Sequence, residues 1–222
     1  MTAAAIWAVL PLKPLAQAKQ RLAPTLGPKE RAGLSLAMAT DVLATLTTVP
    51  ALDGVLVVTA DDALAALTAM HGARHLNEDT AAGYSEAVSK AAAQLAEEGA
   101  AAMICVPGDV PLVTASEIEA LVAALAHPPA IALAPDAERD GTNALALAPP
   151  SLLAPQFGPA SFARHRTAAD AMALPATVLD LPGLALDIDT VDDLRALVAR
   201  GPGGTTRAYL AEAGLLGRLS AA

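Results

Sequence analysis

Carboxylates stand at two points of this chain where buried strands should end. Asp109 follows the apolar run 101–106, and Asp187 and Asp189 come just before the helical stretch 191–200. The edge beyond the strand ends is where open α/β sheets bind ligands. Carboxylates gathered there repel one another unless a cation lies between them, and oxygen ligands suit Mg²⁺, which also bridges phosphates. We therefore expect the three aspartates to share a magnesium site.

The spacing of Asp187 and Asp189 has two interpretations. In an extended chain the two carboxylates share one face, while Ile188 between them points into the core. Alternatively, Asp189 and Thr190 form only the N-cap of the following helix, whose dipole favours acidic side chains in its first turn. The sequence leaves both interpretations open for Asp189, whereas Asp109 and Asp187 together favour metal binding.

Three basic side chains follow the first expected strand. Lys13, Lys19 and Arg21 lie in a segment that lacks the G-x-x-x-x-G-K pattern of a P-loop. Doubly wound folds nevertheless bind phosphates after the first strand, where lysine offers a point charge and arginine a bidentate contact. Such cations stabilise the charge that develops on a triphosphate during nucleotidyl transfer. We expect Lys13, Lys19, Arg21 and Asp109 to be the catalytic groups of Mg²⁺-dependent chemistry on a nucleoside triphosphate.

The charge of the chain is unevenly distributed. The net charge is −9, yet residues 1–31 carry +4, so the remainder carries −13. An acidic protein with one basic segment is a poor nucleic-acid binder but suits a small polyphosphate, although a solvated positive face would give the same composition. Lys29 and Arg31 lie inside an expected helix and are interpreted as ordinary surface charges.

Length and composition indicate one domain with an aliphatic core. The chain has 222 residues, of which 54% are apolar and 2% aromatic. No run of about 18 uninterrupted apolar residues indicates a membrane span, and the N-terminus lacks the charged start of a signal peptide. The single cysteine, Cys105, excludes an intrachain disulfide and is interpreted as a small core residue. We expect a cytoplasmic monomer or homodimer without membrane or nucleic-acid partners.

Strand and helix patterns alternate along the chain, which predicts an α/β fold with a mostly parallel sheet and helices on both faces. The run 144–148 is expected to return antiparallel. Residues 1–200 are expected to form one domain, with 201–222 as a hinge (Gly201-Pro202-Gly203-Gly204) and a last helix packed on that domain. Strands are expected at 6–10, 55–59, 73–76, 101–106, 130–134, 144–148, 177–180 and 183–186, and helices at 29–48, 61–71, 85–98, 114–126, 157–172, 191–200 and 205–219.

The charged segments belong to a longer series of motifs. The series is Trp7-Ala-Val-Leu-Pro11-Leu-Lys13-Pro14, Ala18-Lys19-Gln-Arg21-Leu22, Arg31, Asp41, Pro107-Gly108-Asp109-Val-Pro111-Leu112, Pro135-Asp136, Gly141-Thr142-Asn143-Ala-Leu145, Phe157-Gly158-Pro-Ala-Ser161-Phe162, His165, Asp187-Ile-Asp189-Thr190 and Asp193-Leu194. In this order, over about residues 6–197, it resembles the phospholactate guanylyltransferase family of deazaflavin coenzyme F(420) biosynthesis. The Gly-Thr-Asn-Ala-Leu and Phe-Gly-x-x-Ser-Phe segments are the most specific, because many sugar-nucleotide transferases share the acidic motif.

The resemblance implies a fold, a reaction and a set of site residues. The fold would be a single-domain, Rossmann-like nucleotidyltransferase fold of the glycosyltransferase-A type, with a mostly parallel mixed sheet. The reaction would transfer GMP from GTP to 2-phospholactate, phosphoenolpyruvate or 3-phosphoglycerate, with Mg²⁺ and release of pyrophosphate. Asp109, Asp187 and Asp189 would hold Mg²⁺ and the acceptor. The acceptor would also contact Thr142, Asn143, Gly158 and Ser161, and the nucleotide Pro11, Lys13, Gly83, Ser85, Pro107 and Gly108.

The residues around Gly158 suggest an anion site by themselves. Gly158 and Ser161 precede an expected helix, whose first N–H groups would be free to bind a phosphate or carboxylate. Ser161 could equally be only an N-cap, and Thr142-Asn143 only a turn. His165 lies four residues after Ser161 on the same helical face and is a candidate contact for the acceptor phosphate, although a partly buried helix histidine is the commoner case.

One segment departs from the family pattern. Family members show Gly-Leu-Asn-x-Ala, which helps to hold the base and ribose, where this chain has Gly83-Tyr84-Ser85-Glu86-Ala87. Ser85 lacks the paired donor and acceptor of an amide, so the sequence does not fix the base. Two alternatives remain: a related sugar-phosphate or molybdopterin-type nucleotidyltransferase, and a non-catalytic nucleotide-binding paralogue.

Overall fold

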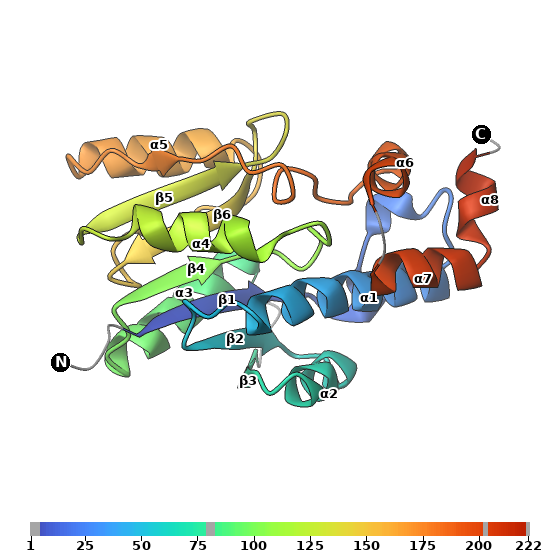
Figure 1. The fold of residues 1–222 in the computed structure, drawn as a ribbon, viewed down its shortest axis with the longest axis horizontal. Coiled ribbons are helices and arrows are strands. Elements are labelled where there is room, and N and C mark those ends of the chain that lie inside the picture. Colours follow the sequence, from blue (N-terminus) through green and yellow to red (C-terminus); the bar gives the residue numbers. More distant parts are fainter. Residues whose placement is uncertain (1–4, 79–82, 202–203, 221–222) are drawn as a thin grey trace.

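The computed structural model describes residues 5–78, 83–201 and 204–220, which are built around a seven-stranded sheet (Figure 1). Its strand order is β3-β2-β1-β4-β6-β5-β7. Paired strands are parallel except at β6, which runs antiparallel to β4 and β5. The predicted α/β class and the antiparallel return are therefore confirmed. The strands are β1 (Ile6–Pro11), β2 (Gly54–Thr59), β3 (Arg74–Asn77), β4 (Ala102–Cys105), β5 (Ala130–Pro135), β6 (Thr142–Ala148) and β7 (Thr177–Val178).

Helices cover both faces of the sheet, because successive strand residues point to opposite faces. Ala8 and Leu10 of β1 pack in a core cluster with α1, α2 and α4, whereas Val9 packs on the other face with α3 and α5. The helices are α1 (Pro28–Thr47), α2 (Asp62–Met70), α3 (Tyr84–Glu97), α4 (Ala115–Ala124), α5 (Ser161–Ala171), α6 (Val191–Arg200), α7 (Thr205–Glu212) and α8 (Leu215–Ser220). This arrangement leaves the carboxyl ends of β1 and β4 side by side at one edge.

A third core cluster lies beyond this edge, where α6, α7 and α8 gather around the first half of α1 (Figure 1). Asp41 links α1 to α7, because its carboxylate accepts hydrogen bonds from Thr205 N (2.7 Å) and Thr206 N (2.8 Å) at the start of α7. The cluster also contains residues of both charged segments. Its buried members are Leu22, Leu26, Leu34, Met38, Leu186, Ile188, Leu194, Leu197, Leu210, Leu215 and Leu219.

Two expected elements are wrong in the C-terminal part of the chain. Residues 183–186 form a turn and not a strand, because Gly183 N donates to the Glu117 carboxylate (2.6 Å) and a side chain at Gly183 would collide with the Leu112 carbonyl. The helix expected over 205–219 is two helices, since Gly214 adopts φ +67 between them and ends α7. Of the expected hinge, Pro202 and Gly203 lie outside the described residues.

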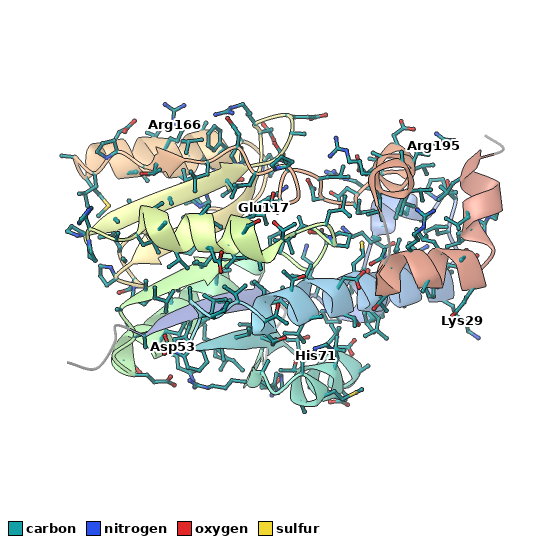
Figure 2. The ribbon with its side chains drawn as sticks, viewed as in Figure 1. Lys29, Asp53, His71, Glu117, Arg166 and Arg195 are labelled. Carbon is teal, nitrogen blue, oxygen red and sulfur yellow. The ribbon has the colours of Figure 1, made fainter. Side chains whose placement is uncertain are left out.

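The two charges expected at the surface of α1 differ in their environment. Lys29 is exposed and projects from the outer surface (Figure 2). Arg31 is buried, which corrects the expectation, and its guanidinium donates to Leu26 O (2.8 Å). Arg31 therefore supports the loop that follows the basic segment.

In the described ranges, none of the helices is both long enough and apolar enough to cross a membrane.

Candidate functional site

The basic segment after β1 forms two short 3₁₀ turns, Leu15–Gln17 and Gln20–Leu22. Leu15 N donates to the carboxylate of Asp61 (2.9 Å), which also caps α2, and Leu22 is buried in the third core cluster. Lys19, between the turns, adopts the left-handed conformation with φ 50 and ψ 46, which is uncommon for a residue other than glycine. The loop is thus fixed at both ends, with a strained residue at its centre.

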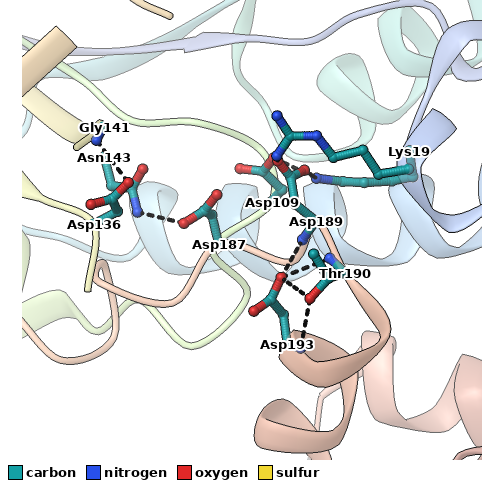
Figure 3. A network of polar contacts seen from close by, with 10 residues as sticks. Lys19, Asp109, Asp136, Gly141, Asn143, Asp187, Asp189, Thr190 and Asp193 are labelled. Atoms are coloured by element: carbon teal, nitrogen blue, oxygen red, sulfur yellow. Dashed lines mark hydrogen bonds and ion pairs between the residues drawn. The ribbon is translucent and has the colours of Figure 1, made fainter. Parts of the chain in front are cut away.

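The side chain of Lys19 turns inward and contacts two of the three aspartates (Figure 3). Its Nζ lies 2.6 Å from Asp109 Oδ2 and 2.9 Å from Asp189 Oδ1. Burial alone would lower the pKa of Lys19, but the two carboxylates outweigh burial and raise it, so the ammonium is charged. Burial opposes ionisation of Asp189 as well, yet Lys19 and Arg21 hold the pKa of Asp189 below its ordinary value.

Arg21 makes a more exposed contact than Lys19. Its Nη1 lies 3.1 Å from Asp189 Oδ2, and its side chain is 76% exposed against 8% for Lys19. The arginine is therefore free to leave the carboxylate for a ligand, whereas the lysine is a fixed part of the site.

A backbone hydrogen bond brings the acidic segments together. Ile188 N donates to Asp109 O (3.0 Å), and Ile188 itself is fully buried. Asp187 accepts a hydrogen bond from Asn143 Nδ2 (3.0 Å), which also donates to Leu184 O (2.8 Å). Burial raises the pKa of Asp187, and the neighbouring carboxylates of Asp109 and Asp189 raise it further. The three aspartates thus lie within electrostatic reach of one another at the sheet edge (Figure 3).

The N-cap interpretation of Asp189 and Thr190 is confirmed for Thr190 and wrong for Asp189. Thr190 is the N-cap of α6, and its hydroxyl accepts from Asp193 N (3.3 Å). Asp193 completes the capping box by accepting from Thr190 N (2.7 Å) and also accepts from Asp189 N (3.0 Å). The carboxylate of Asp189 is therefore not used in capping and contacts the basic segment instead.

These acids do not form a ready three-ligand cage. In the part of the chain that the structure describes, no group of three His, Cys, Asp or Glu side chains is arranged to hold a metal. Lys19 spans Asp109 and Asp189, while Asp187 is held by Asn143. Mg²⁺ commonly takes only one or two protein carboxylates together with waters and substrate phosphates, so the oxygen donors of Asp109 and Asp187 suit it chemically. Magnesium binding stays a prediction.

The described residues form two large cavities at this edge. The basic cavity, of about 390 Å³, lies between the basic segment and α1. The acidic cavity, of about 570 Å³, lies between the start of α3, the start of β6 and the loop before α5. Residues lining both are Lys13, Tyr84, Pro107 and Asp109. The two cavities therefore meet at Asp109.

The two cavities gather most of the predicted site residues. The basic cavity is lined by Pro11, Lys13, Lys19, Arg21, Pro107, Gly108, Asp109 and Asp189. The acidic cavity is lined by Lys13, Gly83, Ser85, Pro107, Asp109, Thr142, Asn143, Gly158 and Asp187. Of the residues predicted for the site, Ser161 and His165 line neither. Ser161 is buried, and the predicted contacts of both residues with the acceptor stay predictions.

The start of α5 is less open to an anion than the sequence suggests. Ser161 N donates to Gly158 O (3.0 Å) and Phe162 N donates to Asp140 O (3.0 Å), so these two N–H groups are not free. Gly158 (φ +112) and Ala160 (φ +54) instead fold the preceding loop against Asp140, whose carboxylate accepts from Ala160 N (3.1 Å). What this end offers to the acidic cavity is the exposed backbone of Gly158.

His165 is fully buried and has a partner at each ring nitrogen. Nδ1 lies 3.0 Å from Thr142 Oγ1, and Nε2 lies 2.8 Å from Gln156 N. Burial lowers the pKa of His165 from 6.5 to about 4, and the neighbouring Arg164 contributes to the shift. The imidazole is therefore neutral near pH 7.

This shift predicts a pH-dependent stability. Between pH 6.5 and pH 4 the unfolded chain binds a proton at His165 that the folded chain does not, so the free energy of unfolding falls as the pH is lowered. The loss should reach about 3 kcal/mol near pH 4 and then level off. Urea unfolding across this range, compared with His165→Gln, measures it. A constant difference between the two proteins would contradict the prediction.

Two aromatic residues of the site were not predicted as site residues. Tyr84 lines both cavities, and Phe157 lines the acidic cavity with its ring packed edge-on against Tyr84 (centroids 4.7 Å apart). Ser85 accepts a hydrogen bond from Phe157 N (2.9 Å) and so holds the same loop. The sequence did carry a signal for both residues. Aromatic residues are scarce in this chain, and Tyr84 and Phe157 each adjoin a glycine predicted for the site.

Comparison with solved structures supports the fold. A candidate nucleotide-diphospho-sugar transferase from Desulfovibrio desulfuricans G20 superposes with a TM-score of 0.78 at 18% identity, covering 96% of each chain. A nucleotidyl transferase from Methanothermobacter thermautotroptrophicus superposes with a TM-score of 0.64 at 18% identity, covering 87% of this chain and 95% of that one. These likenesses confirm the predicted nucleotidyltransferase type of fold.

Comparison of sequences identifies the family. A phosphoenolpyruvate guanylyltransferase from Sphaerobacter thermophilus is 41% identical over 199 residues, which cover 90% of this chain and 95% of that protein. One from Conexibacter woesei is 36% identical over 205 residues, covering 89% and 91%. The model of the family described as guanylyl transferase CofC like matches residues 6–220. The resemblance seen in the motifs is thus confirmed, and the chain belongs to the guanylyl transferase CofC like family.

Proposed function

We propose that this protein transfers GMP from GTP to phosphoenolpyruvate or a closely similar phosphorylated acid and releases pyrophosphate. The observation that carries this proposal is the meeting of two cavities at Lys13 and Asp109. A group transfer between two substrates needs such an arrangement, in which each substrate has its own cavity and the reacting atoms meet where the cavities join. The names of the relatives support guanine and phosphoenolpyruvate.

The basic cavity suits the triphosphate. Lys13 and Arg21 are exposed cations at its wall, and Arg21 can exchange its contact with Asp189 for a phosphate. Their charges neutralise the phosphoryl oxygens and the pyrophosphate that leaves. Gly108 lets the chain pass close to the loop, because a side chain there would collide with Leu12.

The acidic cavity suits the acceptor. Thr142 and the backbone of Gly158 offer polar groups for a phosphate or carboxylate, and Lys13 supplies a positive charge at the shared wall. The amide of Asn143 lines the same cavity, but its nitrogen already donates to Leu184 O and Asp187. An oxygen of the acceptor phosphate forms a bond to the α-phosphorus of GTP. The bond from that phosphorus to the bridging oxygen breaks, and its electron pair leaves with pyrophosphate. No side chain needs to act as a general base, because a phosphate is already ionised near pH 7.

A divalent cation fits this site through Asp109 and Asp187. These two carboxylates would hold Mg²⁺, which would neutralise charge on the substrate phosphates. Asn143 keeps Asp187 oriented toward that position by its 3.0 Å hydrogen bond. Lys19 holds Asp109 and Asp189 in place by two short contacts.

A pyrophosphate-release assay tests the proposal. GTP with phosphoenolpyruvate should give at least tenfold faster release than ATP, CTP or UTP, and phosphoenolpyruvate should be compared with 2-phospholactate and 3-phosphoglycerate. EDTA should abolish release and Mg²⁺ should restore it. Release with a sugar phosphate but with none of the phospho-acids would favour the related sugar-nucleotide transferases. Binding of GTP in calorimetry without turnover of any acceptor would favour a non-catalytic protein.

The departure at Tyr84-Ser85 has a structural explanation that does not require loss of activity. Both residues contact Phe157 at the acidic cavity, Tyr84 by its ring and Ser85 by its hydroxyl. Tyr84 and Ser85 therefore help to position the loop before α5, which lines the acidic cavity proposed for the acceptor. A role in coenzyme F(420) biosynthesis and a cytoplasmic location belong to the same proposal.

A further inference from the structure

The proton of the buried imidazole of His165 can be placed from its partners. Gln156 N–H is a main-chain donor, so Nε2, 2.8 Å away, must accept. A neutral imidazole carries its single proton on one nitrogen, which leaves Nδ1 as the N–H donor. Nδ1–H therefore donates to Thr142 Oγ1 at 3.0 Å. In the opposite tautomer, Nε2–H of His165 and the main-chain N–H of Gln156 would both be donors and would face each other.

This tautomer fixes the hydroxyl of Thr142. Because Oγ1 accepts from His165, the hydroxyl hydrogen must point elsewhere, and Thr142 lines the acidic cavity with 6% of its surface exposed. In the described ranges, Thr142 Oγ1 has His165 as its one hydrogen-bond partner. A threonine whose oxygen accepts from a fixed donor presents its own hydrogen to an oxygen of a ligand.

His165 also fixes the opposite wall of the same cavity. By accepting from Gln156 N it anchors the chain directly before Phe157, whose ring packs edge-on against the imidazole with centroids 5.2 Å apart. Arg164 holds the same turn by donating to Gln156 O (2.9 Å) and Phe157 O (3.1 Å). One imidazole thus joins β6 to the loop before α5.

We propose that His165 is a positioning residue that turns the Thr142 hydroxyl into a hydrogen-bond donor for the anionic acceptor. The proposal deepens the function given above and rests on it for the identity of the ligand, an oxygen of a phosphate or carboxylate. His165 is fully buried and lines neither cavity, so the proposal has it act through Thr142, in place of the direct contact with the acceptor that the sequence suggested.

Two substitutions separate the two hydrogen bonds of the imidazole. In His165→Asn the amide nitrogen takes the place of Nδ1 and can still donate to Thr142. In His165→Gln the amide oxygen takes the place of Nε2, accepts from Gln156 N and leaves Thr142 without its donor. We expect His165→Gln to raise KM for phosphoenolpyruvate about tenfold, as Thr142→Val does, because a hydrogen bond to a charged group is lost or misdirected. His165→Asn should stay within about threefold of the unmodified protein, and KM for GTP should change in neither.

A double substitution tests whether the two residues act as one unit. His165→Gln combined with Thr142→Val should raise KM for phosphoenolpyruvate no more than Thr142→Val alone. Multiplied effects would overturn the proposal, and so would equal losses in His165→Gln and His165→Asn. Thermal unfolding of each variant shows that the comparison is made between folded proteins.

The tautomer itself gives a test that does not depend on turnover. A two-bond ¹H–¹⁵N correlation spectrum should show the proton of His165 on Nδ1 near pH 7, and a proton on Nε2 would overturn the proposal. If the protein turns over no phospho-acid, the proposed function fails. Calorimetry with phosphoenolpyruvate then decides the present inference, because equal binding by the unmodified protein and Thr142→Val would refute it.

Discussion

Asp109→Asn should lower kcat about a thousandfold while the protein stays folded. Asp109 stands where the two cavities meet, and its carboxylate contacts the Lys19 ammonium at 2.6 Å. The amide keeps the shape but loses the charge that orients Lys19 and suits a divalent cation. Losses of a hundredfold to a thousandfold accompany removal of a single electrostatic group at a transition state, and Asp109 serves two partners. Initial rates of pyrophosphate release measure the effect.

Asp180→Asn is the matched control. Asp180 is also paired with a cation, Arg139, at 2.5 Å, but its side chain is 76% exposed and lines neither of the two cavities. Its substitution should leave kcat unchanged, because exposed ion pairs contribute little. An Asp109→Asn protein that retains more than a tenth of the original rate would show that the site has been assigned to the wrong residues.

Lys19→Met should have the second largest effect, with kcat/KM for GTP reduced about a hundredfold. The side chain is 8% exposed and neutralises Asp109 and Asp189 together. Without it the two carboxylates face each other, which should also destabilise the fold by about 1–3 kcal/mol, since both are partly exposed. The same substitution should tighten Mg²⁺ binding in the absence of nucleotide, because the ammonium no longer competes for the carboxylates. Calorimetric titration with MgCl₂ measures this change.

Arg21→Met is the control for Lys19. It removes a cation from the same loop, but its side chain is 76% exposed, and within the described part of the chain its ion pair is with Asp189 alone. We expect its Mg²⁺ affinity to change less than twofold. Weaker or unaltered Mg²⁺ binding by Lys19→Met would mean that Lys19 does not compete with a cation for these carboxylates.

The alternation of elements was predictable because it depends on local patterns. The apolar runs of β1, β2 and β4 are visible within a few residues of sequence, and the structure confirms them. Thr190, one of the two residues expected to cap α6, is its N-cap. The turn at Gly183 was not predictable, because it depends on a hydrogen bond to Glu117, 66 residues away. The burial of Arg31 was not predicted either, although its partner, Leu26 O, lies only five residues earlier in the chain.

The types of residue at the site were easier to predict than their contacts. Aspartates after strands and lysines after β1 are chemically conspicuous, and the structure gathers them at one edge. That Lys19 would lie between Asp109 and Asp189 depends on its left-handed backbone, which no residue pattern specifies. The first N–H groups of α5 looked free, because their partner Gly158 O and the distant Asp140 O become neighbours only after the loop folds back.

The third core cluster has a mechanical consequence for the two sides of the site. Leu22 ties the basic segment to this cluster and Ile188 ties the acidic segment to it, and none of its buried members comes from a strand. The helices α1, α6, α7 and α8 therefore set the positions of the two segments that bear Lys19 and Asp189. Thr142, on the acceptor side, is placed by β6 instead. Changes in the packing of the C-terminal helices should thus be felt at the proposed triphosphate side before they are felt at the acceptor side.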